Sequence, residues 1–369
     1  MQISILQCMA ITFVVVGHIG GASVLGEWFP IYSFHMPLWF FISGYLYNEK
    51  VELNYRSFVW KKIKRLVIPY FVLNTCYGLI AAFLTLRHII DYGVELNLYS
   101  LLIKPWQEGN QFGIDLAGWF VLCLFLIQII YVLLRKIVFK TSFMNEYNFF
   151  VLLLVCGIAG VTAACHGYRS GWWLTVIRVL YALPFYHAGR MYHIQWEKKP
   201  ALSNGKYFLL VFLISYGAQV ISHNHLFIGV WNADFNKLGE YPFVAYITPI
   251  AGIMFWIRIA NIIGQHFENN KFIYFMSRNT WTVMMHHQFV LLIINYCLLK
   301  VHQCNIGILE TFDVTGFREN PWYTYQFFDN SNSLIIFSVL GIVIPLAVKY
   351  ILLKFAKRNC AARIISRIY

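Results

Sequence analysis

Ten segments of this chain are apolar over about 20 residues, the length that an α-helix needs to cross about 30 Å of hydrocarbon. Hydrophobic residues make up 59% of the sequence and charged residues 12%, which is far more apolar than a soluble domain. The pattern predicts an all-α, multi-pass membrane protein with a single domain over residues 1–369. The expected helices lie at 3–24, 30–47, 66–86, 116–134, 148–165, 172–192, 207–226, 241–263, 280–300 and 334–353.

The distribution of basic residues predicts how these helices are oriented. If the N-terminus is cytoplasmic, the inner connecting segments hold 20 of the 29 Lys and Arg residues and the outer segments hold 6. Basic residues concentrate in the cytoplasmic loops of membrane proteins, so both termini are expected in the cytoplasm. The net charge of +13 is then a signal of topology, and no nucleic-acid partner is expected.

Two histidines are expected at membrane depth in the first two apolar segments. His18 lies 15 residues into the first segment, which is about 22 Å along a helix. His35 lies about five residues below the outer end of the second segment. At that depth a neutral imidazole can act as a general base toward a hydroxyl group. The alternative is a pair of buried histidines that only hydrogen-bond to neighbouring helices.

A basic cluster, made of Lys61, Lys62, Lys64 and Arg65, precedes the third apolar segment on its inner side. Such a cluster can bind phosphate groups, because a guanidinium makes bidentate contacts and an ammonium acts as a point charge. The alternative is an anchor on anionic membrane lipids.

Further features bear on substrate binding. Arg178 is a charged residue within the sixth apolar segment, where it is expected to donate to a substrate oxygen, including one that gains negative charge as an oxyanion. The outer loops 87–115 and 301–333 mix aromatic and acidic residues, which suits either sugar rings or an interfacial aromatic belt. The eight cysteines are scattered without a spacing that suits zinc, so no metal is expected.

Six stretches, taken in order, resemble the acyltransferase-three family of membrane O-acyltransferases. They are VVVGH, FHMPLWFFISGYLY, KKIKRLVIPY, GWFVLCLF, ALPFYHAGR and TWTVMMHHQFVLLIIN. The chain looks most similar to fucose 4-O-acetylase-like and capsular polysaccharide O-acetyltransferase-like members. The resemblance implies ten core helices in a bacterial cell membrane and acetyl-CoA as acyl donor, without a permanently bound cofactor. It also implies that the acceptor is a sugar hydroxyl on a glycan or lipid-linked glycan.

The resemblance also implies roles for individual residues. His18 matches the histidine that the family uses as catalytic base, and His35 is a second catalytic candidate. The second histidine of MMHH, His287, matches the histidine of a ninth-segment motif. Lys62 and Arg65 match a pair of basic residues, and with them the basic cluster is expected to bind the acyl-CoA.

Other matched positions are candidates for substrate contact. Ser43 and Gly44 match a Ser-Gly pair at which another backbone or the pantetheine arm can come close, unless the pair serves only helix packing. Trp119, in GWFVLCLF, is a further candidate. The chain departs from the family at Gln7 and Ser4, where a basic and an acidic residue are usual, so the basic cluster is expected to supply the missing positive charge.

The mechanism expected from these assignments is attack of an acceptor hydroxyl on the thioester with His18 as base, and a route through an acetyl-histidine stays open. One alternative function is a glycan or lipid transporter or flippase, for which an internal repeat would be expected. Another is a noncatalytic subunit of a glycan-synthesis complex. A homo-oligomer is compatible with each of these functions.

Overall fold

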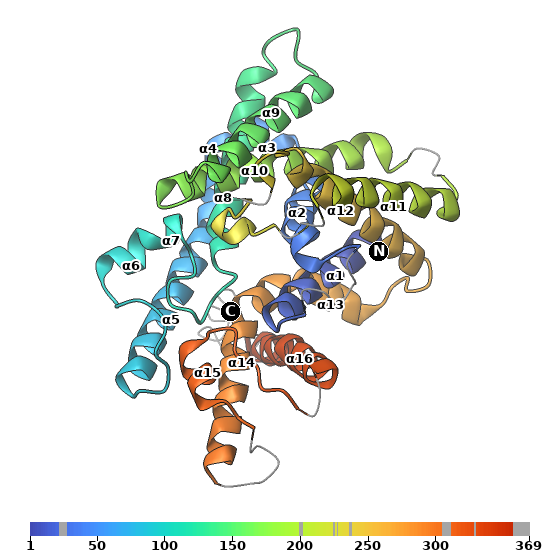
Figure 1. Cartoon of the computed structure of the whole chain (residues 1–369). Coiled ribbons are helices and arrows are strands. Elements are labelled where there is room, and N and C mark those ends of the chain that lie inside the picture. The colour runs from blue at the N-terminus through green and yellow to red at the C-terminus, as the bar shows by residue number, and fades with distance from the viewer. Residues whose placement is uncertain are drawn as a thin grey trace.

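The computed structural model describes residues 1–21, 28–198, 202–223, 226, 228–235, 238–304, 311–327 and 330–356. Over these residues the chain is helical and contains no β-strand, which confirms the all-α class. A helix lies at each of the ten apolar segments (Figure 1). These helices are α1 (Gln2–His18), α2 (Ile31–Tyr45), α5 (Ile68–Leu86), α8 (Trp119–Val138), α9 (Glu146–Cys165), α10 (Trp172–Met191), α11 (Asn204–Ile221), α12 (Val244–Gly264), α14 (Thr280–Gln303) and α16 (Asn330–Ala356).

Shorter helices extend or connect these long ones. The π-helix η1 (Ile63–Val67) joins α4 to α5, so the chain is continuously helical from Tyr55 to Leu86. A second π-helix, η2 (Tyr192–Trp196), continues α10. The remaining short elements are α3 (Lys50–Leu53), α4 (Tyr55–Lys62), α6 (Leu98–Leu102), α7 (Lys104–Gln107), the 3₁₀-helix η3 (Val230–Asn232), α13 (Lys271–Arg278) and α15 (Val314–Glu319).

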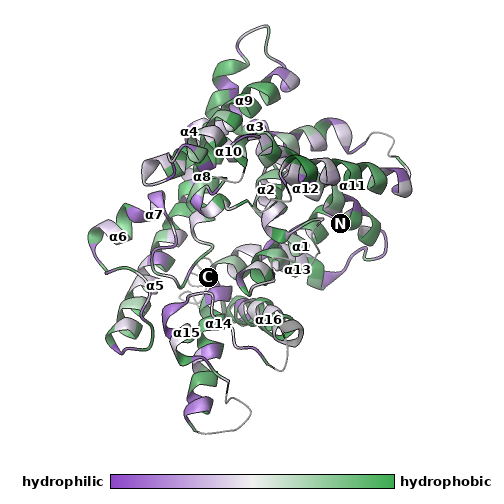
Figure 2. Cartoon of the chain, viewed as in Figure 1, coloured by the Kyte–Doolittle hydropathy of each residue, from purple (hydrophilic) through white to green (hydrophobic). Residues whose placement is uncertain are grey.

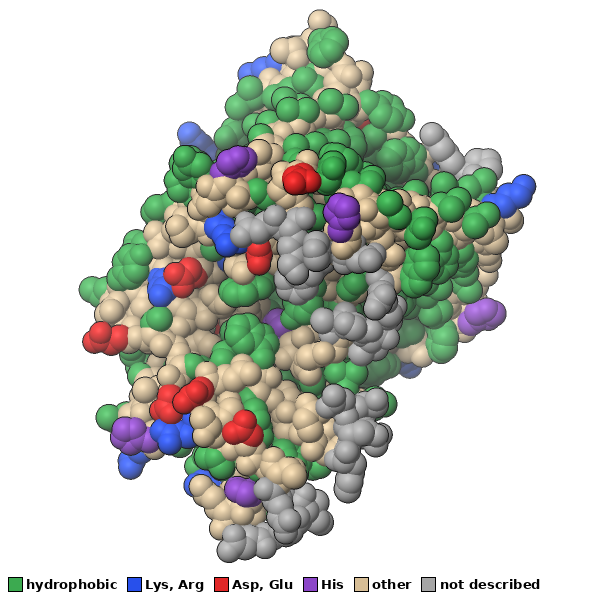
Figure 3. Space-filling view, viewed as in Figure 1, with side chains coloured by type: hydrophobic (Ala, Val, Ile, Leu, Met, Phe, Trp, Pro, Cys, Tyr) green, Lys and Arg blue, Asp and Glu red, His purple; other side chains and the backbone are tan. Residues whose placement is uncertain are grey.

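Six helical segments of the described chain are long and apolar enough to cross a membrane, namely 55–86, α8, α9, α12, α14 and the 333–356 part of α16. Figure 2 shows that hydrophobic residues dominate the long helices. Large apolar side chains such as Leu79, Val155 and Ile335 are exposed, as lipid contact requires. Hydrophobic side chains also form broad patches on the face seen in the space-filling view (Figure 3). The chain is therefore a multi-pass membrane protein, whereas ten crossings and cytoplasmic termini stay predictions.

The first helix ends earlier than its apolar segment predicts. The pattern predicts a helix to residue 24, but α1 ends at His18. Gly20 has a φ of 88°, and the N–H groups of Gly20 and Gly21 donate to the carbonyl oxygens of Gly17 and Val16 at 3.3 and 3.0 Å. This pair of bonds is the Schellman motif, which ends helices at a left-handed glycine. The predicted boundary is wrong because Gly20 terminates the helix within an apolar stretch, and His18 is its last residue.

Helix α2 lies at the centre of the bundle and contacts α1, α10 and α12 (Figure 1). A Cβ atom added to Gly44 would overlap the carbonyl oxygen of Tyr186, and one added to Gly189 would overlap that of Phe41. The backbones of α2 and α10 therefore touch, which only glycine permits at these positions. Close approach of another backbone, one of the roles expected for Gly44, is therefore present between α2 and α10.

A buried ion network, made of Arg135, Glu146, Arg190, Glu52 and Glu49, ties α8, α9 and α10 to the start of α3. The Arg135 guanidinium donates to both carboxylate oxygens of Glu146 at 2.8 and 3.1 Å and to Glu52 at 3.0 Å. Arg190 donates to Glu146 at 3.0 Å and also to Glu49. Both arginines are almost completely buried, so the carboxylate of Glu146 is needed to balance them.

Candidate functional site

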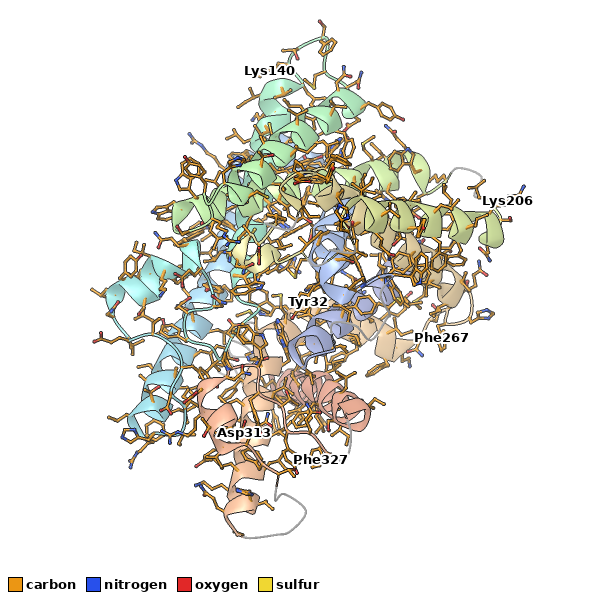
Figure 4. All side chains as sticks on the ribbon, viewed as in Figure 1. Tyr32, Lys140, Lys206, Phe267, Asp313 and Phe327 are labelled. Carbon is orange, nitrogen blue, oxygen red and sulfur yellow. The ribbon has the colours of Figure 1, made fainter. Side chains whose placement is uncertain are left out.

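A cavity of about 570 Å³ lies between α1, α2 and the first turn of α8. His18 and His35 both line it, so the structure brings together the two histidines that were predicted to form one site. Tyr32, labelled near the centre of Figure 4, also lines the cavity. The remainder of the lining comes from α14 and from three loop segments, 110–117, 228–231 and 320–326.

His18 is hydrogen-bonded to a third histidine, His287 of α14. The Nδ1 atom of His18 lies 2.8 Å from Nε2 of His287, and the two rings stack with centroids 5.0 Å apart. His287 is fully buried, whereas His18 is partly exposed to the cavity. This contact joins residues 269 positions apart in sequence, and it places His287 directly behind His18.

The partners of His287 determine where the protons lie on both rings. Nδ1 of His287 lies 2.8 and 3.0 Å from the carbonyl oxygens of Val283 and Met284, which can only accept, so this nitrogen carries the proton. In a neutral imidazole the other nitrogen, Nε2, then accepts, and His18 must donate through its Nδ1. Nε2 of His18 is left with a lone pair. This is the protonation state that a general base requires.

His35 presents a second basic nitrogen to the same cavity. Its Nδ1 lies 2.8 Å from the carbonyl oxygen of Ile31, so Nδ1 is the protonated nitrogen and Nε2 keeps a lone pair. Tyr32 packs edge-on against the His35 ring, and its hydroxyl donates to the carbonyl oxygen of Gly17 at 3.1 Å. These contacts hold the first turn of α2 against the end of α1.

The two adjacent histidines of α14 point to different neighbours. His287 faces α1, whereas Nδ1 of His286 lies 2.5 Å from the hydroxyl of Tyr77 on α5. This divergence is expected, because successive helical residues point about 100° apart. Within the described residues no group of three or more His, Cys, Asp or Glu side chains is arranged to hold a metal ion.

Trp39 is a site residue that sequence reasoning missed. It follows His35 by one helical turn, lines the cavity and is buried. Its indole N–H has no hydrogen-bond partner in the described part of the chain. An unpaired buried donor is costly, so we expect this N–H to gain a partner when a substrate binds. The i, i+4 spacing from His35 was the signal that could have found it.

Arg178 takes up a different environment from the one expected. Its guanidinium donates to the carbonyl oxygens of Glu108 at 3.1 Å, of Gln107 at 3.4 Å and of Trp231. It also stacks on the ring of Trp119, 4.7 Å from the ring centre. Trp119 lines the cavity, whereas Arg178 is not among the lining residues. The contacts favour a positioning role for Arg178, and its role as an oxyanion donor stays a prediction.

The basic cluster lies apart from the histidines. Lys61, Lys64 and Arg65 are exposed and Lys62 is half-buried, on α4 and η1. None of the four lines the cavity, and none has a carboxylate within ion-pair distance among the described residues. The cluster is therefore free to bind an external anion. Ser43 is half-buried and, like Gly44, does not line the cavity.

The two residues at which the chain departs from the family pattern line one groove, at the N-terminal end of α1. Ser4 and Gln7 line a groove of about 380 Å³ together with Tyr45, Glu197 and Arg278. Arg278 was counted only as a topology signal in the sequence, yet it supplies a cation in the same groove as Gln7. Sequence spacing could not reveal this, because Arg278 reaches the groove from α13.

The comparisons with known proteins agree with this architecture. A family model described as an acyltransferase domain, of the acyltransferase-3 type, matches residues 2–354. No curated protein and no solved structure matches the chain significantly. The match covers the histidine-lined cavity, the basic cluster and all ten long helices. The chain therefore belongs to the acyltransferase-3 family and is a multi-pass membrane acyltransferase.

Proposed function

We propose that this acyltransferase moves an acetyl group from acetyl-CoA to a sugar hydroxyl of a glycan or lipid-linked glycan, with His18 as general base. The observation that carries the proposal is the hydrogen-bond chain from Val283 through His287 to His18. It leaves Nε2 of His18 unprotonated on a residue that lines the cavity. A base whose second nitrogen is oriented by another buried group is the arrangement that hydroxyl activation needs.

The transfer step follows from this protonation state. The acceptor hydroxyl oxygen attacks the thioester carbonyl carbon while Nε2 of His18 takes the hydroxyl proton. The new C–O bond forms, the C–S bond breaks, and the proton passes from His18 to the departing sulfur, which leaves as the thiol of CoA. His18 keeps its Nδ1 proton and its bond to His287 throughout. The indole N–H of Trp39 is the donor proposed for the carbonyl oxygen as negative charge develops there.

The two substrates are proposed to reach the site from opposite ends of the bundle. The basic cluster and the Arg278 groove both offer cations for the phosphates of acetyl-CoA. The outer loop segments 228–231 and 320–326 supply aromatic and amide side chains to the cavity, which suit a sugar. Nε2 of His35 is available to accept a hydrogen bond from either substrate.

The test is acetyl transfer by purified protein in lipid nanodiscs, with radiolabelled acetyl-CoA and a panel of glycans. His18→Ala is expected to lower transfer by at least a hundredfold, because general base catalysis contributes about 10²–10⁴. His166→Ala is the matched control, since His166 is exposed and lies outside the cavity lining. Wild-type rates in His18→Ala would refute the mechanism. Acetyl-histidine trapped by rapid quenching would show the two-step route instead of direct transfer.

A further inference from the structure

Two tryptophans form an aromatic corner in the lining of the cavity. Trp231 belongs to η3, in the loop between α11 and α12, and Trp322 lies between α15 and α16. Their ring centroids are 6.3 Å apart and their planes meet at 54°. Both side chains line the cavity, and Trp322 is 39% exposed, so its ring is open to a ligand.

The corner is held in place by the protein itself. The carbonyl oxygen of Trp231 accepts a hydrogen bond from Arg178, which also binds the end of α7. On the other side, the backbone N–H of Trp322 donates to the side-chain oxygen of Asn320 at 2.9 Å. The amide of Gln288 on α14 donates to the carbonyl oxygen of Pro321. Binding to an aromatic surface that is already fixed costs little ordering entropy.

The polar side chains that line the cavity around the corner carry no charge. The lining contains the amides of Asn110, Asn320 and Gln326 and the hydroxyl of Thr324. Amides both donate and accept, as sugar hydroxyls do. Among the described residues that line the cavity there is no Asp, Glu, Lys or Arg. A carboxylate or phosphate in this cavity would therefore be desolvated without a charged partner, which is costly.

We infer that the ring carrying the acceptor hydroxyl is an uncharged pyranose whose apolar face packs on Trp322 and whose edge lies against Trp231. The inference rests on the proposed function, and it adds the class of sugar and the residues that select it. Aromatic side chains can cover the C–H face of a pyranose while the amides bind its hydroxyl edge. The same cavity then discriminates against uronic acids and phosphorylated sugars.

The experiment measures sugar binding without acetyl-CoA, by saturation-transfer NMR on protein in nanodiscs. Methyl β-galactopyranoside, methyl β-glucopyranoside and methyl fucopyranoside are compared with methyl β-galacturonide and methyl β-glucuronide. At least one neutral glycoside is expected to bind, and its uronide is expected to bind at least tenfold more weakly. Trp322→Ala is expected to weaken neutral binding at least fivefold, and Trp322→Phe is expected to restore most of it. Trp173→Ala is the matched control, because Trp173 is exposed at the start of α10 and does not line the cavity.

The inference would be overturned by no binding of any neutral glycoside, by equal binding of a glycoside and its uronide, or by unchanged binding in Trp322→Ala. Equal losses in Trp173→Ala and Trp322→Ala would also overturn it, because an interfacial aromatic belt would then explain both. Acetyl transfer is assayed separately. Protein that binds neutral glycosides through Trp322 but transfers no acetyl group would contradict the proposed function and still support a neutral-sugar site at this corner.

Discussion

At the scale of single residues, the central feature is a chain of proton donors and acceptors. Carbonyl oxygens on α14 fix the proton of His287 on Nδ1, and this fixes the proton of His18 on Nδ1 as well. Side-chain identity alone does not determine which imidazole nitrogen is basic. Here the backbone of one helix determines the basic nitrogen on another.

Replacing His287 tests this chain. His287→Ala removes the acceptor for Nδ1 of His18, so the ring can rotate or change tautomer. We expect kcat to fall at least tenfold, which corresponds to about 1.4 kcal/mol of transition-state stabilisation, with a smaller change in the KM for acetyl-CoA.

His287→Asn provides the control for a purely structural role. Its amide oxygen can still accept a hydrogen bond, so it should recover part of kcat. Thermal unfolding of both variants separates loss of orientation from loss of fold. If His287→Ala folds normally and keeps the wild-type kcat, the prediction is contradicted.

Replacing Trp39 tests the proposed oxyanion donor. Trp39→Phe keeps an aromatic ring but removes the N–H together with part of the indole, so we expect kcat to fall tenfold or more while the KM for acetyl-CoA changes less. Trp256→Phe is the matched control, because Trp256 is another indole without a hydrogen-bond partner in the described chain, and it lines a separate apolar groove. Equal effects of the two substitutions would count against a role for Trp39 in catalysis.

At the scale of elements, the ion network explains how charged side chains near the ends of α8, α9 and α10 can be buried next to one another. The Glu146 carboxylate binds two arginines from two other helices. Removing it leaves Arg135 with Glu52 alone and Arg190 with Glu49 alone, and Glu49 contacts Arg190 from the surface.

Glu146→Gln is therefore expected to destabilise the fold by about 3–5 kcal/mol. Glu49→Gln should cost about 1 kcal/mol or less, because Glu49 is 63% exposed and solvent weakens its pair with Arg190. Unfolding by SDS titration in mixed micelles measures both. Similar losses in the two variants would show that Glu146 does not carry the network.

The basic cluster and the groove beside Gln7 are alternative binding sites for the phosphates of acetyl-CoA, and kinetics can distinguish between them. If the basic cluster binds acetyl-CoA, the double variant Lys62→Ala with Arg65→Ala should raise the KM for acetyl-CoA tenfold or more, because each charge-assisted hydrogen bond contributes about 1.5–3 kcal/mol. If the groove beside Gln7 binds it, Arg278→Ala should have that effect instead. Arg56→Ala, exposed on α4 outside the cluster, is the control. An unchanged KM in the double variant would favour a lipid anchor.

At the scale of the whole molecule, the prediction that has most structural consequence is the topology. With a cytoplasmic N-terminus, Cys304 at the end of α14 faces outward and Lys140 after α8 faces inward. A membrane-impermeant maleimide should label a variant with Cys304 as sole cysteine in intact cells. A cysteine-free variant with Lys140→Cys should be labelled only after permeabilisation. The reverse pattern would invert the proposed routes of donor and acceptor.

The helices could be predicted from sequence because an apolar run of about 20 residues has few other stable arrangements. The end of α1 could not, since the apolar pattern hides the effect of Gly20. His18 and His35 stood out because polar side chains are costly at membrane depth. Trp231 and Arg278 were missed, because only tertiary packing brings them to the cavity and to the groove.

The early end of α1 has an electrostatic consequence. His18 is the last residue of that helix, at the end where the helix dipole places a partial negative charge of about half a unit. In the proposed mechanism His18 takes a proton from the acceptor hydroxyl, and the resulting imidazolium would lie in that favourable field. A helix continuing to residue 24 would have placed the histidine within the rod, away from the negative end. The glycine turn that shortens α1 therefore also stabilises the cation that the reaction creates.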